Sequence, residues 1–268
     1  MSAEGAAAKP GIFIPYRHAK SVRPVAGGYP ALGQAFADRR AAFDGTLDAI
    51  DRHGAALKAI PAEATAPAAR WNQDWFPRLD AACAYALVRE RRPNLIAEIG
   101  SGHSTRFLAR AVQDSGGATR IVAVDPEPRA PIALPGVEHI RATLQDAGDA
   151  PFDALASGDM LFVDSSHVLM PGSDVDIVLN RLLPALPAGV LVHLHDVFLP
   201  EAYPQEWTWR GYNEQNAIAA MLQGGAWQPL FASRYARKAH AERLARSVVS
   251  ALPLWPGAYE SSLWLEKA

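Results

Sequence analysis

The chain has 268 residues, of which 49% are hydrophobic, and this is enough to bury one large core or a core with a smaller cap. Its formal net charge of −2 gives no general attraction to polyanions, so nucleic acid is not an expected partner. The single cysteine, Cys83, excludes an intramolecular disulfide and a thiolate zinc cluster. Neither an apolar run of membrane-spanning length nor a signal-peptide pattern is found, so we expect a soluble, cytoplasmic protein without a membrane partner.

The N-terminal third predicts helices that pack beside a larger domain. Residues 1–29 mix proline, glycine and basic residues, which is typical of an irregular arm. In residues 31–58 the spacing of the large apolar residues predicts one amphipathic helix, with a stripe of Phe36, Phe43, Leu47, Ile50 and Leu57. A linker over 61–70 and a second helix that ends before Pro93 follow. We expect an arm and helical cap over residues 1–78 and a second domain over 79–268.

From Leu95 onward, short apolar runs alternate with helical patterns. Seven strands are predicted, over residues 95–100, 120–125, 137–142, 159–164, 190–198, 227–235 and 261–267. Several of the runs are apolar on both faces, as in a parallel sheet that helices cover on both sides. This alternation predicts an α/β fold with a Rossmann-like, doubly wound sheet.

The segment "EIGSGHST" joins the first predicted strand to a helix. Gly100 and Gly102 can form a tight turn there, and Asp125 closes the second strand, where its carboxylate can accept hydrogen bonds from both hydroxyls of a ribose. Ligands of open α/β sheets bind at the carboxyl ends of the strands. The position and chemistry of these residues therefore predict a nucleotide-type cofactor, although glycines often do no more than turn the chain.

Two cofactors compete for this loop. A dinucleotide site favours a third small residue where this chain has Thr105. The acidic Glu98 suits a ligand with an ammonium group and no phosphate, such as S-adenosylmethionine. We favour S-adenosylmethionine over a nicotinamide dinucleotide and over a purely structural loop.

Several motifs taken together carry a family resemblance. The segments "AEIGSGHST", "VAVDPEP", "LQDAGD", "GDMLFVDSSHV" and "VHLHDVFLPEAYPQEW" resemble class I S-adenosylmethionine-dependent methyltransferases of the Methyltransf_24 type, over roughly Asp80 to Leu265. The resemblance implies the strand order 3-2-1-4-5-7-6, with the last strand of the sequence antiparallel. It also implies a set of cofactor-binding residues: Glu98, Gly100, Ser101 and Gly102 at the methionine end, Asp125 at the ribose, Gln145 and Asp146 beside the adenine, and Asp164 at the rim.

Charged residues and imidazoles follow the two most apolar strands. Asp164 and Asp196 end neighbouring strands, so their carboxylates are expected to converge, because adjacent strands lie about 5 Å apart. Together with His195 they are expected to form a divalent metal site, which would activate a substrate hydroxyl. His193, two residues before His195, is expected to be a core histidine.

The same residues resemble those of metal-dependent O-methyltransferases of the catechol and macrolide-sugar types. The macrolide-sugar enzymes have a D-x-x-H pattern, which here runs from Asp164 to His167, and the resemblance makes His167 the expected base, with His195 as the second candidate. Asp164 and Asp196 complete the expected catalytic set. His195 stands where those enzymes carry an acid, so either a transition metal replaces magnesium or no metal binds.

Aromatic residues are dense after the fifth strand, in "FLPEAYPQEWTWRGYNEQ". They predict either a substrate wall or packing over the sheet edge. Asp174 and Asn213 are each expected to cap a helix.

These observations together predict an S-adenosylmethionine-dependent methyltransferase of a small molecule, with oxygen as the acceptor atom. Three alternatives remain: another use of the same cofactor, such as its intramolecular cyclisation; a nicotinamide-dependent oxidoreductase; and a non-catalytic binding protein. The sequence leaves the oligomeric state open, with a homodimer among the alternatives.

Overall fold

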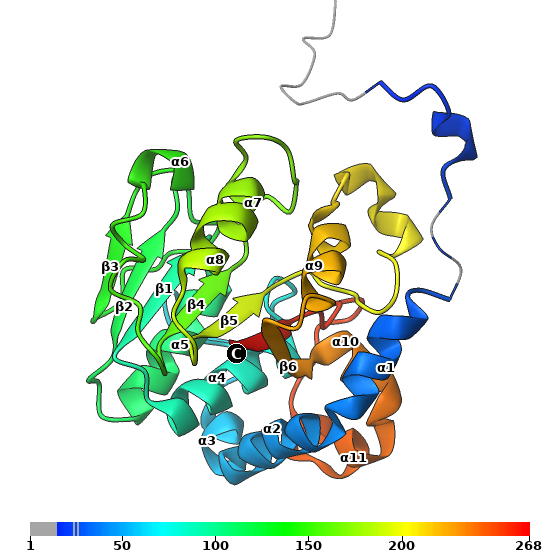
Figure 1. The fold of residues 1–268 in the computed structure, drawn as a ribbon. Coiled ribbons are helices and arrows are strands. Elements are labelled where there is room, and N and C mark those ends of the chain that lie inside the picture. The colour runs from blue at the N-terminus through cyan, green and yellow to red at the C-terminus, as the bar shows by residue number, and fades with distance from the viewer. Residues whose placement is uncertain (1–14, 24, 26) are drawn as a thin grey trace, which may run out of the picture.

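The computed structural model describes residues 15–23, 25 and 27–268; the remainder of the expected N-terminal arm lies outside the described residues. A seven-stranded sheet of order β3-β2-β1-β4-β5-β7-β6 forms the centre of the molecule (Figure 1). Its strands are β1 Leu95–Ile99, β2 Arg120–Val124, β3 Val137–Ile140, β4 Met160–Val163, β5 Leu191–Leu194, β6 Trp227–Ala232 and β7 Leu263–Lys267. β7 runs antiparallel to β5 and to β6, while β1 to β5 are mutually parallel. The predicted fold class and strand order are confirmed.

Helices cover both faces of the sheet. On one face α4 (Arg78–Arg91) packs against α5 (His103–Asp114) and α2 (Arg40–Arg52), and α2 also reaches β6. The opposite face carries a helical segment of α7 (Asp174–Ile177), a π-helical turn (Val178–Leu182) and α8 (Leu183–Ala185), and α9 (Glu214–Leu222) lies beside it (Figure 1). Smaller helices complete the chain: α6 Leu144–Ala147, α10 Ser233–Ala239, α11 Ala241–Arg246, and 3-10 turns at Ala19–Ser21, Gln205–Arg210 and Val248–Ala251.

The single helix predicted over residues 31–58 is wrong. The chain forms α1 (Pro30–Asp38), α2 and α3 (Gly54–Ala59) instead, and the backbone leaves the helical conformation at Arg39 and His53. At these breaks Arg39 donates from Nε to the carbonyl of Pro229 (3.1 Å) and His53 contacts Glu90 (2.8 Å).

The apolar stripe of this region is nevertheless buried as predicted. The residues Phe36, Phe43, Leu47, Ile50 and Leu57 join the same core as the strands. Burying several large apolar side chains there contributes far more free energy than the two helix breaks cost, since each is worth about 1.5–3 kcal/mol. A domain boundary at residue 78 stays a prediction.

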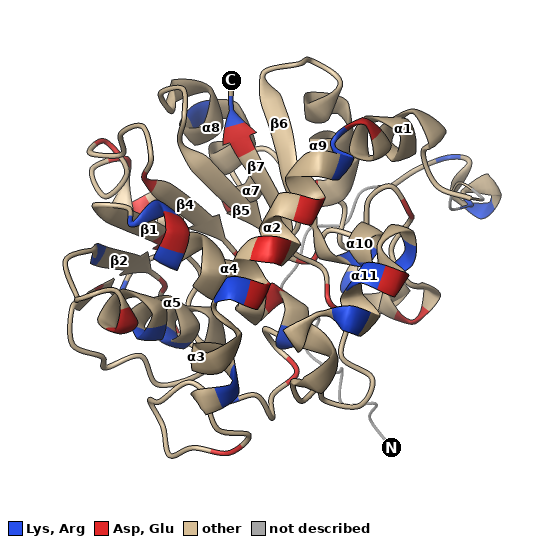
Figure 2. Ribbon diagram, turned by 90° about the horizontal axis from the view of Figure 1, so that it is seen from below, with Lys and Arg blue, Asp and Glu red and all other residues tan. Residues whose placement is uncertain are grey.

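Charges of both signs alternate along the outer helices. Seen from below, Lys/Arg and Asp/Glu are interspersed on α2, α4 and α11, and ion pairs such as Arg52–Glu90 and Arg243–Asp48 connect neighbouring elements (Figure 2). This mixture leaves no extended basic stripe on those helices. Among the described residues, no helix has the length and apolar character needed to cross a membrane.

Candidate active site

The turn after β1 depends on glycine at position 100. Gly100 has φ +77°, a conformation that side chains with a Cβ rarely adopt, and a Cβ there would collide with the carbonyl of Asp164 on the neighbouring β4. Its own N–H donates to the carbonyl of Val124 on β2 (3.0 Å). The glycine therefore lets the ends of β1 and β4 meet, and this closes the inner wall of a crevice at the carboxyl ends of the strands.

Glu98 lies beneath this turn and does not line the crevice as expected. Its carboxyl group is fully buried and accepts hydrogen bonds from the hydroxyls of Ser104 and Thr105, both at 2.6 Å, at the start of α5. Burial raises the pKa of Glu98 to about 8, against the lowering effect of the two hydroxyls. A protonated, enclosed Glu98 fixes the helix start from below, so the sequence argument that it meets an ammonium group directly needs correction.

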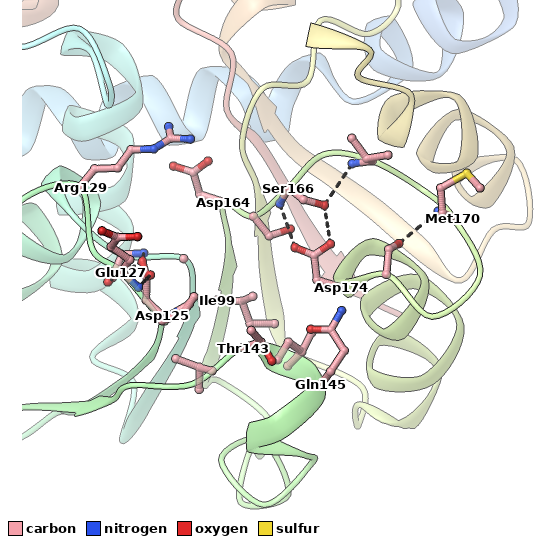
Figure 3. A pocket seen from close by; sticks show the side chains of 18 residues that line it. Ile99, Asp125, Glu127, Arg129, Thr143, Gln145, Asp164, Ser166, Met170 and Asp174 are labelled. Carbon is pink, nitrogen blue, oxygen red and sulfur yellow. Dashed lines mark hydrogen bonds between the residues drawn. The ribbon is translucent and has the colours of Figure 1, made fainter. Parts of the chain in front are cut away.

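A crevice of about 510 Å³ opens between the ends of β1, β2 and β4 (Figure 3). Asp125 holds its floor: one carboxylate oxygen accepts from the N–H (2.6 Å) and the hydroxyl (2.9 Å) of Ser101, and the other accepts from the N–H of Glu127 (2.8 Å). Gly100, Ser101, Gln145 and Asp164 line the crevice as expected. This volume lies within the range of about 300–1,000 Å³ that is usual for small-ligand sites.

Two other expected cofactor residues lie elsewhere. Asp146 is exposed and accepts a hydrogen bond from the hydroxyl of Thr143 at the start of α6, so it stabilises that helix and does not line the crevice. Gly102 borders a smaller adjoining cavity with Ser101 and His103, at the first turn of α5.

The charge of the crevice is strongly negative. Four carboxylates line it, those of Asp125, Glu127, Asp164 and Asp174, against the single guanidinium of Arg129. The side chain of Arg129 reaches toward Asp164 (Figure 3). A pyrophosphate placed here would face four like charges, whereas a sulfonium or ammonium group would be attracted.

Beside the crevice, buried acids and imidazoles form what we call the rim cluster. Its members come from four elements or loops far apart in the sequence: Asp80, Asp164, His167, His195, Asp196 and Glu214. The structure therefore brings together all four expected catalytic residues. It adds Asp80 and Glu214, which sequence reasoning missed.

His167 stands at the centre of the cluster. Its Nε2 lies 3.2 Å from Asp164 and 3.5 Å from Asp196, and its Nδ1 lies 2.9 Å from Glu214. Burial by itself would lower the pKa of His167, but the acids around it, Asp164 and Glu214 first, raise that pKa well above its ordinary value. The residue has φ +59°, a conformation that costs about 1–3 kcal/mol, and Asn213 and Glu214 donate their N–H groups to its carbonyl. The surrounding hydrogen bonds thus hold this imidazole in place in spite of the strained backbone.

His195 is held from the opposite side. Its Nε2 lies 3.3 Å from the buried Asp80, and its Nδ1 lies 3.4 Å from Asp196 and 3.7 Å from Asp164. Asp80 in turn accepts from the N–H groups of Ser261 (2.9 Å) and Ser262 (3.0 Å), just before β7. Burial opposes protonation of His195, but Asp164 and Asp196 raise its pKa well above the ordinary value.

The residues expected to bind a metal fit a divalent ion. Asp164, His195 and Asp196 each offer a ligand atom, and these atoms lie within 4.8 Å of one another. The contact of His195 Nε2 with Asp80 resembles the carboxylate–histidine arrangement that orients metal-binding imidazoles. Two carboxylates with one imidazole suit manganese, iron or zinc better than magnesium.

The structure also tests the predictions for His193 and for the two helix caps. His193 is a core histidine as expected: it is buried, stacks on Phe162 at 3.7 Å and contacts the hydroxyl of Ser262. The two expected helix caps are wrong, because Ser173 caps α7 and the side chain of Asn213 bonds the backbone of Leu169 instead. Asp174 accepts from the N–H and the hydroxyl of Ser166, and so fixes the crevice wall.

The missed residues left partial signals in the sequence. Asp80 is an acid inside the otherwise apolar run "LDAACAYAL", and a buried acid needs a partner. Glu214 resembles an ordinary first-turn acid of a helix, a position that favours negative charge without any further role. Only the tertiary structure shows which histidine each acid meets.

A second, small cavity of about 50 Å³ lies on the other side of Asp164. The inner lining is Asp164, His195 and Asp196, and the outer lining is Asp74, Trp75, Arg129, Trp207, Arg210 and Tyr259. We call this the acceptor cavity, because it reaches Asp164, His195 and Asp196 of the rim cluster and shares Asp164 and Arg129 with the crevice. Part of the predicted aromatic loop thus faces a cavity, while Phe198 and Tyr203 pack together behind it.

The family model described as "Methyltransferase domain" (Methyltransf_24) matches residues 97–197. This range includes the glycine turn, Asp125 and four of the six rim-cluster residues, and leaves out Asp80 and Glu214. The search of the curated proteins found no significant match.

Several solved structures are similar. They include the methyltransferase PaMTH1 of Podospora anserina (17% identity, 82% of this chain and 88% of that chain, TM-score 0.45). An O-methyltransferase from Bacillus cereus is 15% identical over 84% of this chain and 91% of that chain, with a TM-score of 0.45. TomG, an O-methyltransferase from Streptomyces achromogenes, is 16% identical over 83% and 89%, with a TM-score of 0.44.

The resemblance found in the sequence motifs, the strand order and the family model agree with one another. Residues 97–197 of this chain therefore match the methyltransferase domain model Methyltransf_24 in the part of the fold that carries the glycine turn and Asp125.

Proposed function

We propose that the protein transfers a methyl group from S-adenosylmethionine to a hydroxyl oxygen of a small molecule. The observation that carries this proposal is the position of a buried, acid-held imidazole, His167, directly beside an acidic crevice suited to a cationic nucleoside. The family match supports the cofactor class.

The crevice offers a partner for each part of the cofactor. Asp125, with Glu127 beside it, is suited to the ribose hydroxyls, and Gln145, which lines the same crevice, is suited to the adenine. The open N–H groups at the start of α5 and the guanidinium of Arg129 are suited to the carboxylate of the methionine part. The acids of the crevice attract the sulfonium and the ammonium groups.

S-adenosylmethionine supplies the methyl group: the acceptor oxygen forms the new C–O bond as the S–C bond breaks. The protein gains rate by aligning the two reactants and by removing the proton of the hydroxyl. His167 accepts that proton at Nε2, because its Nδ1 is bonded to Glu214 and Glu214 stabilises the resulting positive charge. A bound sulfonium nearby disfavours a second positive charge, so cofactor binding shifts His167 toward its neutral, basic form.

A divalent metal forms part of the proposal. Asp164, His195 and Asp196 would hold it, and it would lower the pKa of the acceptor hydroxyl. Asp80 orients His195 for this role.

Mass spectrometry gives the test. The purified protein is incubated with a metabolite extract and S-adenosylmethionine that carries a deuterated methyl group, with His167→Ala as the control. We expect one or more products with the mass of a labelled methyl group, in the wild type alone. Conversion of the cofactor with no labelled product would indicate another use of it, such as its cyclisation.

A cytoplasmic location and the absence of nucleic-acid and membrane partners stay predictions from the sequence. So does the open oligomeric state, which size-exclusion chromatography with light scattering would determine.

A further inference from the structure

The acceptor cavity has two ends of different chemistry. Its inner end holds the carboxylates of Asp164 and Asp196 and the imidazole of His195, whose Nδ1 lies 3.7 Å from Asp164 and 3.4 Å from Asp196. The rest of the lining, which we call the outer end, is formed by the rings of Trp75, Trp207 and Tyr259, the guanidinium groups of Arg129 and Arg210, and the carboxylate of Asp74. The acids of the inner end are already matched by imidazoles, so the unmatched groups lie at the outer end.

Arg210 is the unmatched cation of the outer end. Its guanidinium lies over the ring of Trp207 at 4.3 Å and within 5.3 Å of the Trp209 and Tyr212 rings. One nitrogen donates to the hydroxyl of Tyr212 (2.9 Å), and Nε is buried without a hydrogen-bond partner. Among the described residues, no carboxylate forms an ion pair with Arg210, although most other arginines near acids do so.

This arrangement is costly unless a ligand completes it. A buried N–H of a guanidinium without an acceptor loses the full free energy of its hydration, about 1–3 kcal/mol or more. Stacking on the indole holds the guanidinium plane fixed, and its free N–H edge then matches the two oxygens of a carboxylate. Arg129 also borders the acceptor cavity. Because it lines both the crevice and the smaller cavity at the start of α5 as well, we assign it to the cofactor.

We propose that the acceptor is an aromatic hydroxy acid, whose carboxylate binds Arg210 while its ring lies against Trp207 and Tyr259, in the space that Trp75 vacates. This rests on the proposed function, because the ring must present its hydroxyl to His167 and the rim cluster. A flat ring is indicated by the aromatic lining, and the acid group by Arg210. The cavity holds about 50 Å³, less than one ring, so the acceptor enters by displacing the exposed side chain of Trp75, while Arg129 stays with the cofactor.

The test compares acids with their neutral esters. Calorimetry is carried out on the full chain saturated with S-adenosylhomocysteine, with 4-hydroxybenzoate, 3,4-dihydroxybenzoate and 4-hydroxycinnamate as probes and their methyl esters as matched controls. We expect at least one acid to bind about ten- to hundredfold more tightly than its ester, the range of a hydrogen-bonded charge. If no acid binds more tightly than its ester, the proposal is overturned.

Variants then assign the preference to one residue. Arg210→Gln should remove the preference for the acid and leave binding of the ester within about twofold, while Arg210→Lys should retain part of it, since a lysine keeps the charge and loses the planar fork. Arg246→Gln, at an exposed position on α11 away from the cavity, is the control and should change nothing. An Arg210→Gln protein that still prefers the acid would contradict the assignment.

The proposed function and the proposed substrate class can be contradicted independently. S-adenosylhomocysteine that does not bind the wild type contradicts the proposed function. Binding of S-adenosylhomocysteine without a preference for any acid contradicts the substrate class alone.

Discussion

The crevice and the rim cluster adjoin at Asp164, yet the chain builds them in different ways. Most of the crevice lies on the turns that directly follow β1, β2 and β4, and backbone N–H groups fix its key acid, Asp125. The rim cluster combines side chains from residue 80 to residue 214, buried together with their charges. The crevice for the cofactor is therefore formed by residues that directly follow the strands. The rim cluster, in contrast, depends on contacts between charged residues that are far apart in the sequence.

The largest expected effect is on the rim cluster. His167→Ala should lower turnover by about 10²–10⁴-fold, the usual contribution of a general base, and leave the affinity for S-adenosylmethionine within about twofold. Steady-state kinetics with calorimetry separates the two quantities. His53→Ala, which removes a half-buried histidine on the far side of α4, is the matched control. A full loss of cofactor binding in His167→Ala would mean that the two regions are not separable.

The reverse effect is expected in the crevice. Asp125→Asn should weaken S-adenosylmethionine binding by about ten- to hundredfold, because it removes a charged acceptor and releases Ser101. Turnover at saturating cofactor should change much less. Calorimetry on Asp125→Asn and on the exposed Asp153→Asn as control measures this, and equal affinities would show that Asp125 does not hold the ribose.

The buried partner of His195 tests the metal hypothesis. The wild type should bind Zn²⁺ or Mn²⁺ and lose activity on chelation, and Asp80→Asn should weaken that binding about 10–100-fold, as expected for a residue that orients a metal ligand. Circular dichroism shows whether the variant still folds. Activity that survives exhaustive chelation in the wild type would remove the metal from the account and leave His167 as the sole activating group.

A further effect, on stability and not on function, concerns Glu98 beneath the glycine turn. In the unfolded chain the pKa of this carboxyl group has its ordinary value of 4.5. In the folded chain burial raises the pKa to about 8. Between these values the folded state binds the extra proton, so the free energy of unfolding should fall by roughly a few kcal/mol as the pH rises from about 4.5 to about 8. Glu98→Gln carries no titrating proton and should flatten this slope in denaturant unfolding measured at pH 5 and pH 8. An unchanged slope would contradict the burial of an uncharged Glu98.

The same contrast explains what could be predicted from the sequence. The strand order, the glycine turn and the position of Asp125 follow from local patterns and from the family resemblance, because each lies at the end of an apolar run. The convergence of Asp164 with Asp196 followed from the rule that neighbouring parallel strands end at one edge.

The rest depends on contacts between distant segments. Glu98 was placed in the crevice because sequence proximity to a glycine turn does not show on which side of the backbone a carboxyl lies. Asp80 and Glu214 were missed because an acid within a helix has no local mark of the histidine it meets. The helix breaks at Arg39 and His53 coincide with contacts to β6 and α4. The spacing of the apolar residues in α2 gives no information about these contacts.

The most direct test of the central claim is calorimetric titration of the full chain with S-adenosylmethionine and, separately, with NAD. The account predicts one site that binds S-adenosylmethionine and loses affinity in Asp125→Asn, and no binding of NAD, because four carboxylates line the crevice. Binding of NAD, together with no heat from S-adenosylmethionine, would contradict it.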